Sequence, residues 1–572
     1  MESEMSISKL VAGASVMAMS LAAGTQANGQ TRPANAVEMT AVENVALVEL
    51  AGAPLFEGLG DYHRRITTAN AGAQSYFDQG MVLAFGFNHA EAIRSFRAAQ
   101  RLDPQCAMCF WGEALATGPN INVTAKGKAV MSPEERKSAF AAIGKAMDLR
   151  FNASPAEQLL IEAQAARYNG DPDTGREPLD QAYSDAMGQY VAAHPDDDDA
   201  SAIFAESLMN LMPWDYWSDA GLPKEDTRKV IATLEKIIER SPNHPLALHL
   251  YIHAVEASET PGIAEDEADR LLDLVPASGH LVHMPAHIYW RVGRYDDAAK
   301  ANIRAAAVDE EYIAACNAQG FYPALYYPHN IHFLWAATSM SGQSAMALAS
   351  AEKLAANVRM EQIEQFPTVE FFKTIPLLTQ VQFGRWDEIL AQSEPPTPRD
   401  YSRAIMNYAR GLALVHKGRA AEAQVELDQL AQAKDSVQIS FLDNADYPAS
   451  VLLNIAHGLL AGELALEEGD DDKAIGLFQE AVSLQDELPY MEPPFWYYPT
   501  RQSLGQALLV ADRAAEAEAV YRQDLKDYPR NGWSMAGLIQ SLKAQGKATQ
   551  EAQSDFAVIW SKADVDLEGS RF

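Results

Sequence analysis

Seven of the thirteen histidines in this chain lie in one stretch, between Pro245 and His332. They occur in three groups, within HPLALHLYIHAVEAS, GHLVHMPAHIYWRVGRY and YPHNIHFLW. The seven are His249, His253, His280, His283, His287, His329 and His332. Spacings of three and four residues place each group on one face of its own helix. Packing so many imidazoles together without a cation would leave buried donors and acceptors unpaired, so the pattern predicts a metal site.

The ligand type restricts the metal. Neutral imidazole without thiolate suits zinc, copper, iron or nickel and disfavours magnesium or calcium. Seven histidines exceed what one tetrahedral zinc needs, so we expect two ions with about three histidines each, an arrangement similar to a coupled dicopper centre. Copper and zinc are the favoured metals, and Met284 adds slight weight for copper. Each histidine alone could instead be a hydrogen-bonded core residue, stack on a ligand ring or serve as a general base.

Glu256 is the candidate catalytic residue because it lies on the same helical face as His249 and His253. Its carboxylate could act as a general base, as a ligand, or as a partner that orients a ligand. The HEXXH motif is absent from the sequence, so a thermolysin-like protease is not supported.

The elements that must position these side chains are paired helices. From Ala73 the chain follows the 34-residue tetratricopeptide pattern of aromatic, small and proline residues. The matching residues are Tyr76, Gly80, Leu83, Ala92, Phe96, Ala99 and Pro104. Further units are expected to start near residues 245, 279, 328, 404, 455 and 498, and a last pair opens at Trp533. Between 134 and 245 the helical pattern continues but the repeat is degraded. No run alternates with a period of two, so we predict an all-α tetratricopeptide-repeat superhelix without a sheet.

Composition limits the partners and the location. The 572 residues carry a formal net charge of -33, which argues against nucleic acid or an anionic membrane as partner. The run LVAGASVMAMSLAAG before Ala27 is typical of a secretory signal, and no later segment is expected to be long and apolar enough to span a membrane. We therefore predict a periplasmic or secreted protein. The expected divisions are 1–27 signal peptide, 28–72 tether, 73–392 repeat array with the histidine groove, and 402–572 C-terminal array.

Three segments interrupt the array. The loop ATGPNINVTAKGKAVMSPEE after Leu115 is long enough to fold over a groove. The acidic run at 195–200 fits a helix start, since aspartates favour the positive end of the helix dipole, with a calcium site as the alternative. The proline-rich stretch at 393–400 is a candidate linker between two halves.

Cysteine usage is sparse, with only Cys106, Cys109 and Cys316. The pair Cys106-x-x-Cys109 stands at a helix start and could form a structural disulfide, act in redox chemistry or bind metal. Asn120 and Asn122 follow it and could reach into the groove.

Aromatic clusters at 212–217, 321–328 and 493–499 favour interhelix packing, although Tyr326 and Tyr327 could line a pocket beside His329.

The chain resembles a family of secreted bacterial tetratricopeptide-repeat proteins. The segments that carry the resemblance are CAMCFWGEALATGPNIN, the histidine blocks and PPFWYYPTRQSLGQALL. In such arrays the first helix of each pair lines the concave groove through its second, fifth and ninth places. The resemblance therefore implies that all seven histidines face one groove, and it implies no particular reaction.

Two hypotheses follow from the sequence. The first is a transition-metal protein holding one or two ions in its groove, a candidate oxidoreductase acting on a small molecule, with hydrolysis by a metal-bound water as the second reaction class. The alternative is an adaptor without catalysis, whose groove binds a peptide or protein partner.

Overall fold

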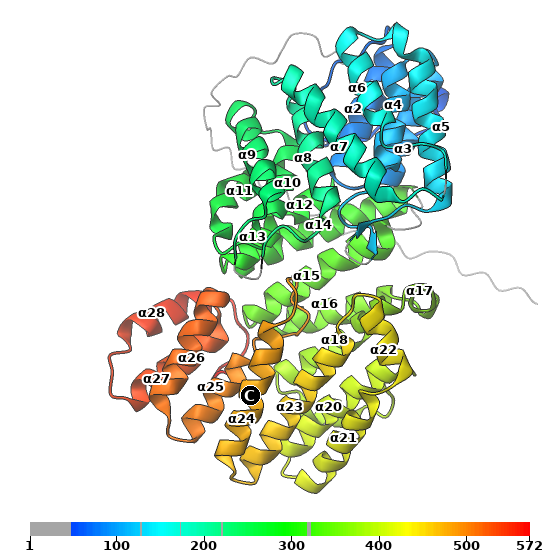
Figure 1. The fold of residues 1–572 in the computed structure, drawn as a ribbon. Helices are drawn as coiled ribbons and strands as arrows, with labels where there is room; N and C mark the ends of the chain where they lie inside the picture. The colour runs from blue at the N-terminus through cyan, green and yellow to red at the C-terminus, as the bar shows by residue number, and fades with distance from the viewer. Residues whose placement is uncertain (1–46, 126–127, 172, 219–220, 317–321) are drawn as a thin grey trace, which may run out of the picture. The chain divides into compact units, whose positions relative to one another are not determined.

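The computed structural model describes residues 47–125, 128–171, 173–218, 221–316 and 322–572, and Leu47–Phe572 form one compact unit. The expected signal peptide lies outside the described residues. Within them the chain is almost entirely helical (Figure 1), and consecutive helices pack against each other as antiparallel neighbours. The all-α prediction is confirmed.

The helices before the histidine stretch are α2 (Ala71–Phe85), α3 (His89–Leu102), α4 (Ala107–Thr117), α5 (Pro133–Leu149), α6 (Pro155–Ala165), α7 (Arg176–Ala193), α8 (Asp198–Leu211) and α9 (Glu225–Arg240). The histidine stretch forms α10 (Pro245–Val255), α11 (Glu265–Leu274), α12 (Gly279–His283), α13 (Pro285–Arg291), α14 (Tyr295–Cys316), α15 (Tyr327–Met340) and α16 (Ser344–Asn357). The remainder is α17 (Met360–Gln365), α18 (Phe371–Gln382), α19 (Trp386–Ala391), α20 (Asp400–His416), α21 (Ala420–Ala433), α22 (Val437–Asn444), α23 (Ala449–Glu467), α24 (Asp471–Asp486), α25 (Arg501–Val510), α26 (Ala514–Asp527), α27 (Gly532–Ala544) and α28 (Gln550–Ile559).

Small residues explain how paired helices approach closely. A Cβ on Gly80 or Gly112 would fall within 2.7 Å of the Phe96 ring, so both glycines leave room for that ring between α2, α3 and α4. Gly462 makes the same room for Phe478 in a later pair. These residues occupy the small and aromatic positions of the repeat pattern. Because glycine has no Cβ, the aromatic ring can pack directly against the backbone.

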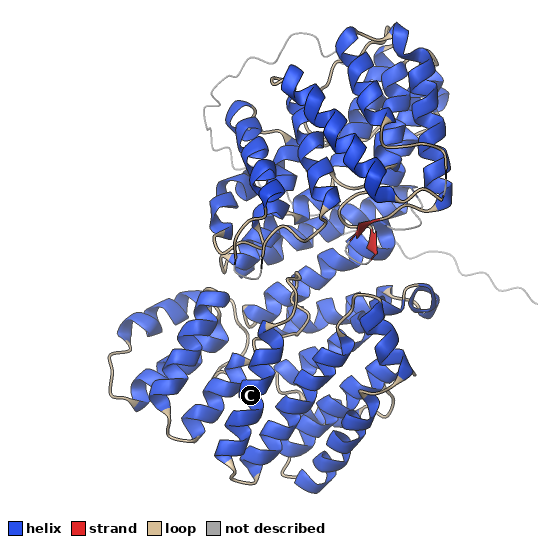
Figure 2. Cartoon of the chain, viewed as in Figure 1, coloured by secondary structure: helices blue, strands red, loops and turns tan. Residues whose placement is uncertain are grey.

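Two short strands are the only sheet in the described residues (Figure 2). β1 (Thr124–Ala125) and β2 (Lys128–Ala129) pair antiparallel, with Thr124 opposite Ala129. They lie in the long loop after α4, where no strand was expected. β2 packs against α8, so this loop folds back over the array.

The acidic run starts a helix as predicted. Asp197 caps α8 by accepting from the Ala200 backbone, and Asp198 and Asp199 occupy the first turn. Asp197 and Asp199 also bind Arg64, at 2.7 and 2.9 Å, which fixes the segment preceding α2 onto α8.

The proline-rich stretch joins α19 to α20. α18 and α20 pack against each other across it. Glu370, at the start of α18, binds Thr397 and Arg399 of this stretch at 2.9 and 2.8 Å.

One helix, α23, is long and apolar enough to cross a membrane by length and composition. The expectation that no such segment follows the N-terminus was therefore wrong for α23. Its most apolar window is 56% buried inside the protein, where it packs against α20, α21 and α24. Core helices of repeat arrays pass the same test.

Candidate metal centre

Three successive repeat units bring the histidines together. α10 carries His249 and His253, the broken helix α12–α13 carries His280, His283 and His287, and α15 carries His329. Pro285 explains the break, because it has no N–H to continue the ladder of α12. The two short helices thus present three imidazoles between α10 and α15.

The histidines form two trios. One nitrogen from each of His249, His253 and His280 lies within 4.8 Å of the others. The same holds for His283, His287 and His329. All six are buried apart from the half-buried His329. We call them the first trio and the second trio.

Within each trio, two ring nitrogens nearly touch. His249 Nε2 lies 3.2 Å from His280 Nε2, and His283 Nε2 lies 2.9 Å from His287 Nε2. Two nitrogens bound at about 2.0–2.1 Å to one tetrahedral ion are about 3.3–3.4 Å apart. The 3.2 Å contact is close to that spacing, and the 2.9 Å contact is shorter than it.

The opposite nitrogens of four ligands face fixed oxygens. His249 Nδ1 lies 2.6 Å from the Phe85 carbonyl oxygen, and His283 Nδ1 lies 2.6 Å from Asn302 Oδ1. His253 Nδ1 and His287 Nδ1 face the two oxygens of Glu256, at 2.7 and 2.5 Å. Oxygen acceptors require a proton on each Nδ1. In the neutral rings of His249, His253 and His283 this leaves Nε2 with a lone pair that can bind a metal ion.

Glu256 is completely buried at the end of α10 and contacts one histidine of each trio. Its backbone carbonyl accepts from Arg291, which also donates to the Ser258 carbonyl at 3.1 Å. With both carboxylate oxygens engaged by imidazoles, Glu256 is placed to orient ligands.

Burial keeps most of the rings neutral. It lowers the pKa of His249, His253, His280, His283 and His329 well below the usual value, and neighbouring histidines lower these pKa values further. Neutral imidazole is the form that binds metal. His287 differs: burial works against its charge, but the carboxylates of Glu256 and Glu492 raise its pKa to about 10.

His332 stands apart from both trios. Its ring stacks on Trp335 at 5.1 Å and contacts Phe371 and Phe372 at 5.4 and 5.3 Å. Phe333, one residue later, takes the place beside the second trio, 4.9 Å from the His283 ring. Four residues separate His329 from Phe333, nearer a full helical turn than the three residues to His332.

A distant segment also reaches the centre. Glu492 Oε2 lies 3.0 Å from His287 Nδ1, and Tyr490 donates to Glu256 Oε2 at 3.4 Å and also binds Glu492. Both residues precede α25 and are more than two hundred positions from their partners. The proline- and aromatic-rich composition of this segment gave no sign of that role.

Phe87 covers the first trio. It is buried with a positive φ of 56°, uncommon for a residue with a large side chain. Its ring centroid lies 4.6 Å from that of His249 and 5.3 Å from that of His280. Tyr326 adds a ring 4.8 Å from His280 and accepts from Asn122 at 3.2 Å. Asn122 thus tethers the long loop beside the trio, whereas Asn120 lies 3.1 Å from His89 Nε2.

Tyr327, the other tyrosine considered beside His329, points to Glu310 instead, at 2.8 Å.

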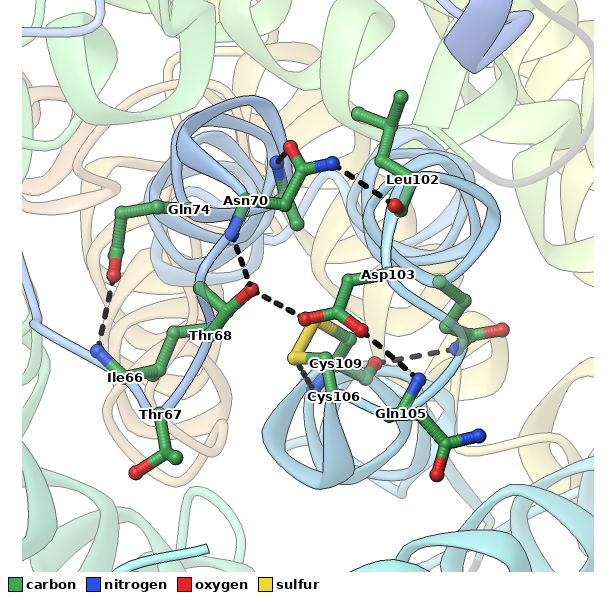
Figure 3. The surroundings of a disulfide bond; sticks show 12 residues. Ile66, Thr67, Thr68, Asn70, Gln74, Leu102, Asp103, Gln105, Cys106 and Cys109 are labelled. Carbon is green, nitrogen blue, oxygen red and sulfur yellow. Dashed lines mark hydrogen bonds between the residues drawn. A yellow bond between two sulfur atoms is a disulfide. The ribbon is translucent and has the colours of Figure 1, made fainter. Parts of the chain in front are cut away.

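Cys106 and Cys109 form a buried disulfide (Figure 3). Cys106 caps α4 by accepting from the Cys109 backbone at 3.1 Å, and Gln100 donates to the Cys109 carbonyl at 3.2 Å. Nearby, Asp103 binds Thr68 and the Gln105 backbone. The disulfide closes the turn between α3 and α4, and neither cysteine belongs to a trio.

The comparisons concern the fold. A tetratricopeptide repeat family model matches residues 73–106. Comparison with curated proteins found no match. Human IFIT1, solved as a dimer with m7Gppp-AAAA, is 12% identical over 93% of this chain and 97% of its own, with a TM-score of 0.31. The Cut9–Hcn1 hetero-tetramer of APC/C is 14% identical over 91% and 79%, with a TM-score of 0.31.

The tetratricopeptide domain of P58(IPK) is 12% identical over 83% of this chain and 99% of its own, with a TM-score of 0.21. The matched unit coincides with α2 and α3, and helix pairs of the same kind follow it along the chain. The fold is an all-α solenoid of helix pairs, and residues 73–106 match the tetratricopeptide repeat.

Proposed function

We propose that each trio binds one transition-metal ion, copper or zinc, in a secreted or periplasmic protein. The supporting observation is the orientation of the rings: four Nδ1 atoms face oxygens. The Nε2 atoms of His249 and His280 lie 3.2 Å apart, those of His283 and His287 lie 2.9 Å apart, and one nitrogen of every ring in a trio lies within 4.8 Å of one nitrogen of the other two. A disulfide is typical of the oxidising compartments outside the cytoplasm.

Hydrogen bonds between the imidazoles, without a metal ion, would satisfy the buried nitrogens less completely. A proton between His283 and His287, and another between His249 and His280, would satisfy the two close contacts. His253 Nε2 and His280 Nδ1 would still be buried without a partner among the described residues. Leaving a buried polar atom unpaired costs on the order of 1–3 kcal/mol, and an ion in the first trio supplies the partner that His253 lacks.

The reaction class proposed for this centre is oxidation or reduction of a small molecule, with hydrolysis second. Bound copper would supply electron transfer, and bound zinc would supply an activated water. In either case Glu256 orients His253 and His287, and Phe87 limits the access of water to the first trio.

The test is elemental analysis of the purified chain after growth with copper, zinc and iron supplied. We expect about two equivalents in the wild type, and about one in His283→Ala/His287→Ala and in His249→Ala/His280→Ala. The matched control His332→Ala should keep both ions. Less than about half an equivalent in the wild type would contradict the proposal, as would a full load in both double variants.

An adaptor function is the second candidate, supported by the tetratricopeptide repeats themselves, which suggest a protein-interaction scaffold. It predicts capture of a peptide or protein partner by the metal-free chain. In that case alanine variants of His249 and His283 should leave partner affinity unchanged, because both side chains are buried.

A further inference from the structure

The segment 564–572 follows α28 and lies against the first helices of three successive helix pairs. It contacts Gln502 of α25 and Trp533 of α27, and the charge of its arginine acts on Glu463 of α23. The segment forms no helix or strand, and residues 564–569 alternate between exposed and more buried positions. Faces built by successive repeats are the surfaces on which solenoid proteins bind segments of other proteins.

Two side chains near the end of the segment fit between the helices. Ser570 is completely buried, and its hydroxyl donates to the Gln502 carbonyl at 2.8 Å. The same hydroxyl accepts from the Tyr521 hydroxyl at 2.8 Å. The Phe572 ring meets the Trp533 ring edge to face, with centroids 5.7 Å apart. The segment is therefore recognised through its polar and its aromatic side chains.

Arg571, between these two residues, supplies the charge. Its guanidinium lies over the Tyr498 ring, 3.7 Å from the centroid. Burial raises the pKa of Glu463 to about 6, and the charge of Arg571 acts against this shift, so the guanidinium lies near that carboxylate. An aromatic face and a carboxylate together select a cation, and a planar guanidinium suits both. The face therefore favours arginine at this position.

The segment is held by side chains rather than by its backbone. Residues 566–572 form no backbone–backbone hydrogen bond with other described residues. Arg571 Nη1, Gln506 Oε1 and both polar atoms of the Gln502 amide are buried without a hydrogen-bond partner among the described residues. A Cβ on Gly569 would lie 3.6 Å from Gln506 Oε1, so a partner for this oxygen is missing where the segment has no side chain. The segment thus satisfies the face incompletely, which leaves room for a competitor.

We propose that this face binds a segment of another protein in which a serine, an arginine and an aromatic residue follow one another. The chain's own segment 564–572 occupies the site in cis, and the partner displaces it. The residues of the site are Glu463, Tyr498, Gln502, Tyr521 and Trp533. None of them belongs to a trio, so the inference goes beyond the metal centre and stands or falls without it.

The experiment releases the segment with the substitutions Arg571→Ala/Phe572→Ala in the full, EDTA-treated chain. A fluorescein-labelled peptide with the sequence of residues 563–572 is then titrated and followed by fluorescence anisotropy. We expect the released variant to bind it with a Kd at or below about 100 µM and the wild type at least about tenfold more weakly, because a linked segment competes at an effective concentration of roughly 1 mM. A peptide with alanine in place of the arginine should also bind at least about tenfold more weakly, since it loses the charged contacts.

Glu463→Gln, added to the released variant, should weaken the first peptide and leave the alanine-containing peptide unchanged. Glu467→Gln, at an exposed position of the same helix, is the matched control. Equal affinity of the wild type and the released variant, equal affinity of the two peptides, or no binding would overturn the proposal.

Circular dichroism and light scattering of both chains complete the test. We expect a released variant that is as helical as the wild type and a monomer in both cases. An unfolded variant would make the segment a structural part of the array and overturn the proposal. A wild-type dimer that dissociates in the variant would overturn it as well, because the segment would then occupy the face of a second copy.

Discussion

At the residue scale, the centre depends on which nitrogen of each imidazole carries the proton. The Phe85 carbonyl, Asn302 and Glu256 hold Nδ1–H groups of His249, His283, His253 and His287. Of these three acceptors, only Glu256 contacts a histidine of each trio. The other oxygens each fix a single ring, so Glu256 is the residue whose loss should affect both ions together.

Replacing Glu256 with glutamine should weaken metal binding at both trios by about 10–100-fold, as loss of a carboxylate partner to a ligating histidine does. The amide keeps one acceptor oxygen but turns an NH2 group toward the other imidazole. Competition with a chromophoric chelator measures the affinity. Glu239→Gln, on an exposed position of α9, is the matched control. A Glu256→Gln protein that binds both ions with wild-type affinity would remove Glu256 from the centre.

At the element scale, α12 must approach α14 closely for its histidines to reach the trios. A Cβ on Gly279 would fall 1.9 Å from Asp309 Oδ1. Asp309 is held by Tyr322 at 2.8 Å and Asn330 at 2.7 Å, so it has little freedom to move. Tyr322 in turn accepts from the His280 backbone at 3.2 Å.

Gly279→Ala should therefore displace α12, lower the free energy of unfolding by roughly 1–3 kcal/mol and weaken metal binding. Urea unfolding and the chelator competition report the two effects. Gly476→Ala in α24 is the control, because no atom lies within 4 Å of the added methyl group there. It should be neutral or stabilise by up to about 1 kcal/mol. A Gly279→Ala variant as stable as the control would show that this contact does not fix α12.

Ion pairs and hydrogen bonds also hold the start of α8 in place. Burial tends to raise the pKa of Asp199, but the hydrogen bond from His244 and the charge of Arg64 lower it to about 2. Tyr62 donates to the same carboxylate at 3.0 Å, and Asp197 shares Arg64. His244 also caps α10, so this network links the segment before α2 to a helix of the first trio.

The pKa of Asp199 is lower in the folded chain, about 2, than in the unfolded chain, about 3.9. Its contribution to the free energy of unfolding is therefore fully present above about pH 3.9 and is lost as the pH falls through about 2. Asp199→Asn should thus lower the free energy of unfolding of the metal-free chain by about 2 kcal/mol at pH 7. The difference from wild type should diminish from about pH 4 downward. Urea titrations of both proteins at several pH values measure it, and a difference independent of pH would contradict the assigned pKa.

At the scale of the whole molecule, the trios join three successive repeat units, so metal should stabilise the array. At a free metal concentration a hundred times Kd, one site contributes about 2.7 kcal/mol. Thermal unfolding should show a higher Tm for metal-loaded than for EDTA-treated chain. His332→Ala should keep the full shift, whereas His283→Ala/His287→Ala should lose about half of it. Equal Tm values with and without metal in the wild type would argue against ions that bridge the units.

Local periodicity predicted the all-α repeat fold, and the expected unit starts near 245, 279 and 328 fall at or next to the first residues of α10, α12 and α15. The starts expected near 404 and 455 fall inside α20 and α23. Gly80 and Phe96 mark a helix pair within one unit, and spacings of three and four residues identified the histidine faces. His332 shows the limit of this reasoning, since Phe333 faces the trio in its place. Glu492 and Phe87 could not be predicted, because their positions depend on packing between units far apart in sequence and on an unusual backbone conformation.

Two ions at two defined sets of nitrogens can be located by anomalous scattering from crystals of metal-supplied protein, recorded on both sides of the absorption edge of the bound metal. We expect two peaks. One should lie about 2.0–2.1 Å from a nitrogen of each of His249, His253 and His280, and the other at the same distance from nitrogens of His283, His287 and His329. A crystal of fully metal-supplied protein with no peak at either trio, or with its metal bound elsewhere, would show that the trios are not metal sites.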